Sequence, residues 1–357
     1  MKSKLSKVVV VLLALTMLVA FVPGCSKSTD TTSSTDTTST PETSVKVAMV
    51  TDVGGLGDKS FNDFSYAGLE KAKKDLGVKT QVLESHEIAD YESNIDQLAS
   101  AGYSPIFAVG FLMTDTVSKL ATQYPDINFA GVDEFFDPVP PNVVGLNFKE
   151  QEGSYLAGVV AGLVTKEKAV SSYVNDDNVI GFVGGMDVPL IQKFEAGYIA
   201  GAKSVNPDVK VISLYAGNFT DIAKGKELGY SLIEQKADVI YAAAGAVGLG
   251  TIEACKDKGA LFIGVDADQY ETVPGSGKVM LTSMVKHLDT VVYMTIKDAV
   301  DGKFVGGTNE EFGLAEDGVG LASFHDFDSV VPQSVKDAVT KATKDIISGA
   351  VMVPTAP

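Results

Sequence analysis

Hydrophobic and polar residues alternate along the chain in a pattern that predicts a regular succession of strands and helices. A short β-rich run, Val45 to Thr51, precedes a stretch from Asn62 to Leu76 in which apolar residues recur every three or four positions. The same order continues in strands expected at Gln81 to Glu84, Pro105 to Val109 and Ile127 to Val132, with helices expected at Tyr91 to Ala101 and Thr114 to Gln123. This βαβ rhythm indicates a parallel sheet covered by helices on both faces.

The rhythm restarts after residue 150, which predicts a second doubly wound unit. A helix expected at Glu152 to Val164 is rich in small residues, and a strand at Val179 to Val183 and a helix at Leu190 to Ser204 follow it. The fold class is therefore α/β, with two parallel-sheet lobes. We expect residues 45–148 and about 269–301 in the first lobe, and 149–268 and about 302–357 in the second. Ligands of such sheets bind beyond the carboxyl ends of the strands.

The beginning of the chain predicts export and a lipid anchor. Three lysines precede an apolar run from Val8 to Val22, and Gly24 and Cys25 follow it. Residues 1–24 are typical of a signal peptide, and their apolar run is shorter than a transmembrane helix usually requires. A small residue directly before cysteine resembles a bacterial lipobox, in which Cys25 is acylated; the alternative is a plain cleaved signal with an incidental cysteine. Residues 25–44 are almost wholly Ser, Thr and Asp, which is typical of a disordered tether.

Composition narrows the class of ligand. The formal net charge is −17, and removal of a segment with three lysines and no acid would make it −20, so nucleic acid is not an expected partner. All 29 basic residues are lysine, so bidentate recognition of a phosphate by arginine is excluded. There is no tryptophan, so any stacking surface must come from Phe or Tyr. Beyond Cys25 only Cys255 remains, which gives no disulfide framework.

Several predicted strands deliver an acid or a glycine to the sheet edge where ligands bind. Asp52, Gly110, Asp133 and Asp266 each follow a strand directly, and Gly245 closely follows a fifth. Each residue alone could serve as a helix cap or turn residue. Their joint occurrence favours a binding site.

The segment from Thr51 to Asn62 combines glycines, acids and an aromatic residue at one strand end. Three of its residues are glycines, which allow close approach to a ligand, and Ser60 is a candidate N-cap for the next helix. Phe61 would face the cleft at the start of that helix, or alternatively pack into the core as a hydrophobic staple.

At this point the chain resembles the basic membrane protein family, which includes the purine nucleoside receptor lipoproteins. The resemblance begins with Asp52 to Asn62 and continues nearly to residue 320 in a series of short matches. In order, these are Val132-Asp133, Gly184-Gly185 with Phe194 in the next helix, Ala244-Gly245, Gly264-Val265-Asp266 and Ser283-Met284-Val285-Lys286.

The resemblance implies a type I periplasmic-binding-protein fold, a site between two lobes, and an ABC transporter permease as partner. Phe61 and Phe194 would sandwich a purine base, and Asp52 and Asn62 would hydrogen-bond its edge. The ribose would be held by Asp133, Asp266 and Lys286, with the backbone of Gly245 nearby. The expected ligand is adenosine, guanosine or inosine, bound without cofactor or metal on the extracytoplasmic face of the cell membrane.

Three alternatives remain open on the sequence: a surface adhesin or sensor, the same fold with another ligand, and an enzyme. The same fold could bind a sugar, an autoinducer or another polar metabolite, which would need the acids but not two opposed phenylalanines. A nucleoside-cleaving enzyme is less favoured. Asp52 and Asp58 supply too few oxygen ligands for a hard cation. The three histidines are scattered and form no zinc motif or catalytic set: His86, His287 and His325. We therefore expect a binding protein and no catalytic residues.

Overall fold

A computed structural model describes residues 44–357 of the chain. The predicted signal peptide, Cys25 and nearly all of the predicted tether lie outside the described residues. Within residues 44–357, no helix combines the length and apolar character that crossing a membrane requires.

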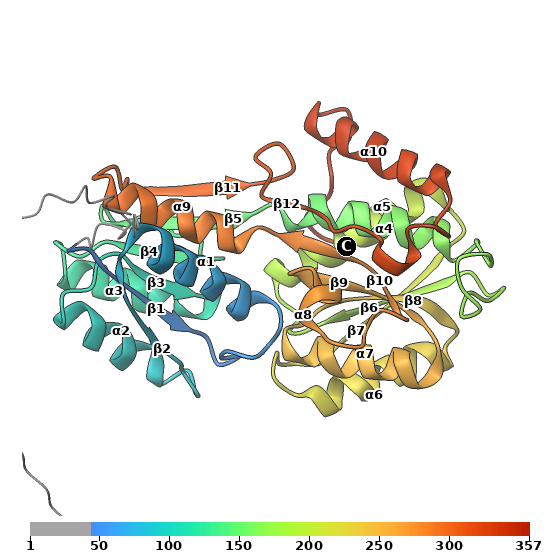
Figure 1. Ribbon diagram of the computed structural model, residues 1–357, viewed down its shortest axis with the longest axis horizontal. Helices are drawn as coiled ribbons and strands as arrows, with labels where there is room; N and C mark the ends of the chain where they lie inside the picture. Colours follow the sequence, from blue (N-terminus) through green and yellow to red (C-terminus); the bar gives the residue numbers. More distant parts are fainter. Residues whose placement is uncertain (1–43) are drawn as a thin grey trace, which may run out of the picture. The chain divides into compact units, whose positions relative to one another are not determined.

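The first lobe contains a six-stranded parallel sheet, built from five strands of residues 46–148 and from β11 (Thr308–Phe312). Its strands run in the order β11-β5-β4-β3-β1-β2, and every pair is parallel. Alternate residues of β1 face opposite sides: Val47 and Met49 pack toward α1 and α9, whereas Ala48 and Val50 pack toward α2 and α3. Helices cover both faces, as the sequence pattern predicts (Figure 1). The strands and helices of this lobe are β1 (Lys46–Thr51), α1 (Phe61–Leu76), β2 (Lys79–Leu83), α2 (Asp90–Ser100), β3 (Ile106–Val109), η1 (Phe111–Met113), α3 (Thr114–Gln123), β4 (Phe129–Val132), β5 (Val143–Phe148), α9 (Leu288–Val300) and β11 (Thr308–Phe312).

A second six-stranded sheet follows the order β12-β10-β9-β8-β6-β7, with β12 as an antiparallel edge strand. Helices α6 and α7 lie side by side along one face (Figure 1), and α4, α5 and α10 lie on the other. Its elements are α4 (Glu150–Val164), β6 (Val179–Gly184), α5 (Pro189–Val205), β7 (Lys210–Tyr215), α6 (Ile222–Glu234), β8 (Ala237–Ala243), α7 (Ala246–Lys258), β9 (Leu261–Asp266), α8 (Gln269–Thr272), β10 (Met280–Lys286), β12 (Val319–Leu321), η2 (His325–Phe327) and α10 (Gln333–Ile347).

Small residues let α4 and α5 pack closely, as expected from the glycine-rich α4 sequence. A Cβ at Gly158 would lie 2.1 Å from the carbonyl oxygen of Tyr198, and one at Gly201 would lie 2.0 Å from that of Tyr155. These distances are far below a van der Waals contact, so only glycine allows the two backbones to approach this closely.

The chain passes between the sheets at positions that differ from the expected boundaries in two places. β10 was expected in the first lobe but pairs in parallel with β9 of the second sheet, with Val285 beside Asp266. β11 was expected in the second lobe but pairs with β5 at the edge of the first. The cause is that α8 returns the chain directly to its own sheet, so the crossing falls after Lys286 rather than near residue 269.

Candidate functional site

A cavity lies at the carboxyl ends of strands from both sheets. Its first-lobe wall comes from the segment after β1, the start of α1, and the residues that follow β3 and β4. Its second-lobe wall comes from α5, from the ends of β8, β9 and β10, and from the loop that follows β7. The position is the one expected for a ligand site in doubly wound sheets.

All eight ligand-binding residues expected from the sequence line this one cavity. They are Asp52, Phe61, Asn62, Asp133, Phe194, Gly245, Asp266 and Lys286. Some of these residues are more than 200 positions apart in the sequence. They lie together because the parallel strands of each sheet end at the same edge.

Asp58 organises the segment between β1 and α1. Its buried carboxylate accepts hydrogen bonds from the backbone N–H groups of Ser60, Asn62 and Asp63, at 3.0, 2.9 and 3.2 Å. Asp58 therefore satisfies amide groups that the first turn of α1 would otherwise leave unpaired. Ser60 occupies the predicted N-cap position of α1, but it makes no capping hydrogen bond through its side chain.

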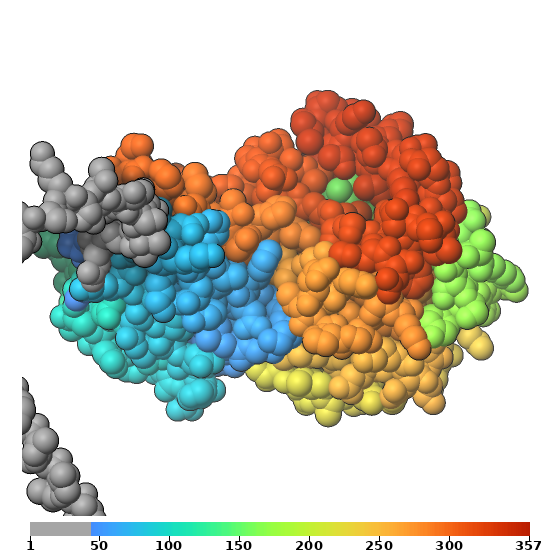
Figure 2. Space-filling model, viewed as in Figure 1, coloured from blue at the N-terminus to red at the C-terminus, as the bar shows by residue number. Residues whose placement is uncertain are grey.

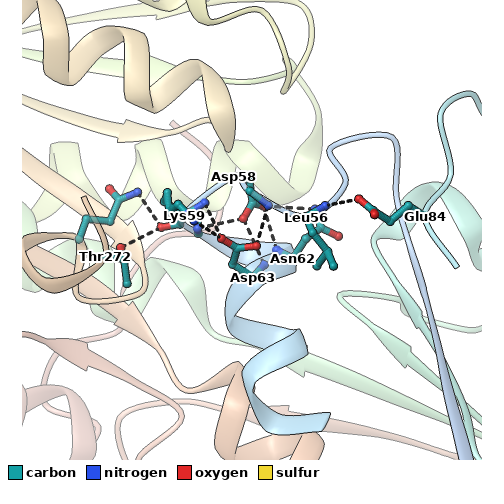
Figure 3. A network of polar contacts seen from close by, with 10 residues as sticks. Leu56, Asp58, Lys59, Asn62, Asp63, Glu84 and Thr272 are labelled. Atoms are coloured by element: carbon teal, nitrogen blue, oxygen red, sulfur yellow. Dashed lines mark hydrogen bonds and ion pairs between the residues drawn. The ribbon is translucent and has the colours of Figure 1, made fainter. Parts of the chain in front are cut away.

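The Ser60 hydroxyl instead joins the two lobes. It donates to Asp266 Oδ2 at 2.5 Å, and Asp266 stands at the end of β9 in the second lobe. The neighbouring carbonyl of Lys59 accepts hydrogen bonds from Gln269 Nε2 and Thr272 Oγ1, both at 3.2 Å (Figure 3). These three contacts are direct bonds between lobes, and the space-filling view shows the corresponding surfaces abutting (Figure 2).

Lys286 is the centre of a buried charge cluster. Its side chain is 1% exposed, and its ammonium lies 2.5 Å from Asp133 Oδ2 and 3.3 Å from Glu150 Oε1. Lys193 contacts the other oxygen of Glu150 at 3.4 Å. The rings of Phe61, Phe148 and Phe194 surround the ammonium, with centroids 5.3, 4.8 and 5.6 Å from Nζ. Such rings attract a cation and keep water away from it.

The electrostatics of this cluster favour a charged lysine. Burial alone would lower the pKa of Lys286, but Asp133, Glu150 and Asp266 outweigh it and raise that pKa above its ordinary value. Burial also raises the pKa of Asp133 to about 7 and raises that of Asp266. Three carboxylates thus share one buried ammonium, and Asp133 Oδ1 has no hydrogen-bond partner among the described residues.

Backbone strain accompanies Asp133 and Asp266. Asp133 and Asp266 have φ angles of 59° and 63°, a conformation that non-glycine residues seldom adopt. Gly245, at the end of β8, has φ 56° and ψ −134°, which suits glycine alone. Strained acids at two strand ends that line the same cavity are typical of a functional site.

Asp52 and Asn62 lie together at another part of the cavity wall. Asn62 Nδ2 donates to Asp52 Oδ1 at 2.9 Å, and that oxygen also accepts from Gly54 N at 2.8 Å. Burial raises the pKa of Asp52, and these two donors act in the opposite direction.

Sequence reasoning missed several residues that line or support the cavity. Phe111 and Phe219 line it from opposite lobes and meet edge to face, with ring centroids 6.4 Å apart. Phe194, by contrast, is 3% exposed and packs beside Lys286. Phe219 could have been predicted as a lining residue, because it follows β7 at the edge of the sheet where ligands bind. Glu150 could not, because it lies in the first turn of a helix rather than after a strand.

The described residues contain no group of three or more His, Cys, Asp or Glu side chains placed to hold a metal ion. Two α/β lobes that contact each other around one cavity form the architecture found in solute-binding proteins. A solved structure of an ABC transporter solute-binding protein from Aeropyrum pernix superposes with a TM-score of 0.80, at 29% identity, over 87% of this chain and 93% of that one.

The chain belongs to the family described as ABC transporter substrate-binding protein PnrA-like, whose model matches residues 45–355. It is 37% identical to a Lactococcus lactis protein named as an ABC transporter nucleoside-binding protein, over 87% of this chain and 90% of that one. A Pyrococcus horikoshii protein named only as an uncharacterized lipoprotein is 39% identical over 80% of this chain and 70% of that one. The protein is thus an ABC transporter substrate-binding protein and not an enzyme, which confirms the family and class expected from the sequence.

The raised pKa of Asp133 predicts how stability depends on pH. The folded-state pKa of about 7 lies above the ordinary 3.8, so the folded protein binds this proton more tightly than the unfolded chain. The resulting stability is fully present below about pH 4 and is lost as the pH rises through about 7. We expect the unfolding temperature of the ligand-free protein to fall between about pH 5 and pH 8, and Asp133→Asn to reduce that slope.

Thermal unfolding followed by circular dichroism across this pH range measures the slope. Asp75→Asn is the matched control, because Asp75 is an exposed acid at the end of α1 whose pKa is lowered by Lys71. Its slope above about pH 5 should equal that of the unaltered protein. A slope that Asp133→Asn leaves unchanged would contradict the prediction.

Proposed function

We propose that this protein is a lipid-anchored extracytoplasmic receptor that binds purine nucleosides between its lobes and delivers them to an ABC permease. The observation that carries the proposal is the unpartnered Asp133 Oδ1 beside the buried Lys286 ammonium. A vicinal diol fits this arrangement, because one hydroxyl can donate to the carboxylate while its oxygen accepts from the ammonium. Asp266, held by Ser60, supplies a second carboxylate within the same cavity.

The charge balance of the cavity favours a neutral nucleoside over a nucleotide. Its lining contains four carboxylates but only one ammonium, that of Lys286. That ammonium is already shared with Asp133 and Glu150, so a phosphate group would enter a negative environment without a free cation to neutralise it.

The aromatic lining fits a flat heterocycle. Phe61 and Phe194 were expected to sandwich the base, and Phe219 adds a further ring from the loop after β7. A purine has two apolar faces and a polar rim, so rings on its faces and acids at its rim match it. Offset stacking adds about 0.5–1.5 kcal/mol per ring pair beyond burial.

The first test compares nucleosides with free bases. A free base leaves the carboxylates of Asp133 and Asp266 without the donors that ribose supplies, at about 1–3 kcal/mol for each unsatisfied group. Calorimetric titration should therefore give guanosine, inosine or adenosine an affinity at least about ten-fold higher than guanine, hypoxanthine or adenine. Asp266→Ala should shrink that gap. Equal affinities for nucleoside and base in the unaltered protein would contradict the proposal.

The second test concerns the rings. Phe61→Ala and Phe194→Ala should each weaken nucleoside binding by roughly 1–3 kcal/mol, through lost stacking and lost burial. Phe219→Ala extends the test to the ring that lines the cavity from the loop after β7. Phe135→Ala is the control, because this ring is 64% exposed and does not line the cavity. If none of the three cavity variants changes the affinity, the rings serve packing alone.

The third test concerns the anchor. Cys25→Ala removes the acylation site that the sequence predicts, so the protein should leave the membrane fraction and appear in the soluble fraction. Its nucleoside affinity should not change, because the cavity is built entirely from residues 52 and beyond. A Cys25→Ala variant that still fractionates with membranes would exclude lipidation at this cysteine.

A further inference from the structure

The side-chain amide of Asn62 is held between the buried carboxylate of Asp58 and the partly buried carboxylate of Asp52. Its Nδ2 lies 2.9 Å from Asp52 Oδ1 and 3.2 Å from Asp58 Oδ2. Asp58 also accepts the backbone N–H of Asn62, so both the position and the rotation of this residue are fixed from one side. Two carboxylates on one amide nitrogen account for both of its protons.

This arrangement determines which atom of Asn62 remains for a ligand. The amide oxygen cannot exchange places with the nitrogen, because it would then face two carboxylates and donate nothing to either. Asn62 Oδ1 is therefore left as an acceptor; it is buried and has no hydrogen-bond partner among residues 44–357. A buried acceptor without a partner is costly, so a ligand that donates to it gains affinity.

A second acceptor stands beside the first. The hydrogen bonds that Asp52 accepts within the described chain, from Gly54 N and Asn62 Nδ2, both go to Oδ1. Asp52 Oδ2 lies on the Gly110 side of the cavity wall, where a Cβ at residue 110 would meet it at 3.0 Å. Both residues line the cavity, so this end of the site offers a carboxylate oxygen and an amide oxygen.

We infer that Asp58 is a specificity-determining positioning residue: with Asp52 it locks the Asn62 amide so that the site accepts only bases whose edge donates an N–H. The inference rests on the proposed nucleoside function and deepens it. Inosine donates through N1–H, guanosine through N1–H and its amino group, and adenosine through its amino group. Purine riboside has the same ring and sugar but only acceptor nitrogens, so it should be rejected.

The ligand series that tests this inference is inosine, adenosine and purine riboside, titrated calorimetrically against the full chain. Purine riboside should bind about ten-fold or more weakly than inosine, because its ring nitrogens would meet two acceptors. If no nucleoside binds, the proposed function itself fails. If inosine and adenosine bind and purine riboside binds equally well, the proposed function stands and this inference is overturned.

The variant Asp58→Asn tests the positioning role directly. An asparagine at 58 keeps one oxygen for the backbone amides of Ser60 and Asp63. Its N–H₂ then faces Asn62 in place of the oxygen that accepts from both the backbone and the side-chain amide of Asn62, so that side chain is no longer held in one orientation. The ratio of inosine to purine riboside affinity should then fall several-fold toward unity. A simple loss of packing would weaken both ligands together and leave their ratio unchanged, which would overturn the inference.

Asp63→Asn is the matched control within the same segment. Asp63 accepts hydrogen bonds from Gly57 N and Lys59 N and pairs with Lys59, but its side chain does not contact Asn62 and does not line the cavity (Figure 3). Asp63→Asn therefore loosens the segment without freeing the amide, and the affinity ratio should equal that of the unaltered protein.

A measurement on the unaltered protein covers the case in which Asp58→Asn does not fold. The side-chain amide of Asn62, identified in an NMR spectrum by its loss in Asn62→Ala, should show two protons that exchange slowly with water without ligand. Fast exchange of either proton in the ligand-free protein would overturn the inference.

Discussion

The buried ammonium of Lys286 holds the binding cavity together, because it lies where both lobes and the proposed ligand must meet. It comes from β10 of the second lobe and pairs with Asp133, which ends β4 of the first. Removal of one partner from such a pair would leave an uncompensated buried charge, which costs several kcal/mol (about 3–5). The surrounding phenylalanine rings exclude water from this ammonium, so its charge is compensated mainly by the ion pair.

The acids around this ammonium explain why the cavity can be selective without a metal or an arginine. Asp133 and Asp266 stand at strand ends in strained backbone conformations, and Asp52 follows β1 at the same edge. Each carboxylate has one oxygen engaged by the protein, by Lys286, Ser60 or Asn62 respectively. The protein thereby fixes the direction of each acid before a ligand arrives, and this preorganisation reduces the ordering cost of binding.

Much of the fold could be predicted because its strands are buried and strongly apolar. The strand from Val45 to Thr51 and the helix from Thr114 to Gln123 match β1 and α3 closely. β11 could not be predicted, because Thr308–Phe312 is a partly exposed edge strand with two adjacent acids and no apolar alternation. Local patterning also does not say which sheet a strand joins, so the assignment of β10 and β11 to lobes had to come from the structure.

The candidate site could be predicted only where chemistry follows a strand end. Asp52, Asp133 and Asp266 met that rule, and all three line the cavity. Glu150 and Asp58 did not. Glu150 reaches Lys286 from the first turn of a helix, and Asp58 sits in an irregular segment whose path is set by its own hydrogen bonds. The role of such residues becomes visible only from their neighbours in the folded structure, because spacing along the sequence does not show which residues lie close in space.

The bonds that Gln269 and Thr272 make to the Lys59 carbonyl have a consequence for how long a captured molecule stays. They join the lobes without involving the cavity, so they hold the lobes together whether or not the cavity is filled. Any separation of the lobes must break these bonds, so they slow the escape of an enclosed molecule while contributing nothing to its recognition.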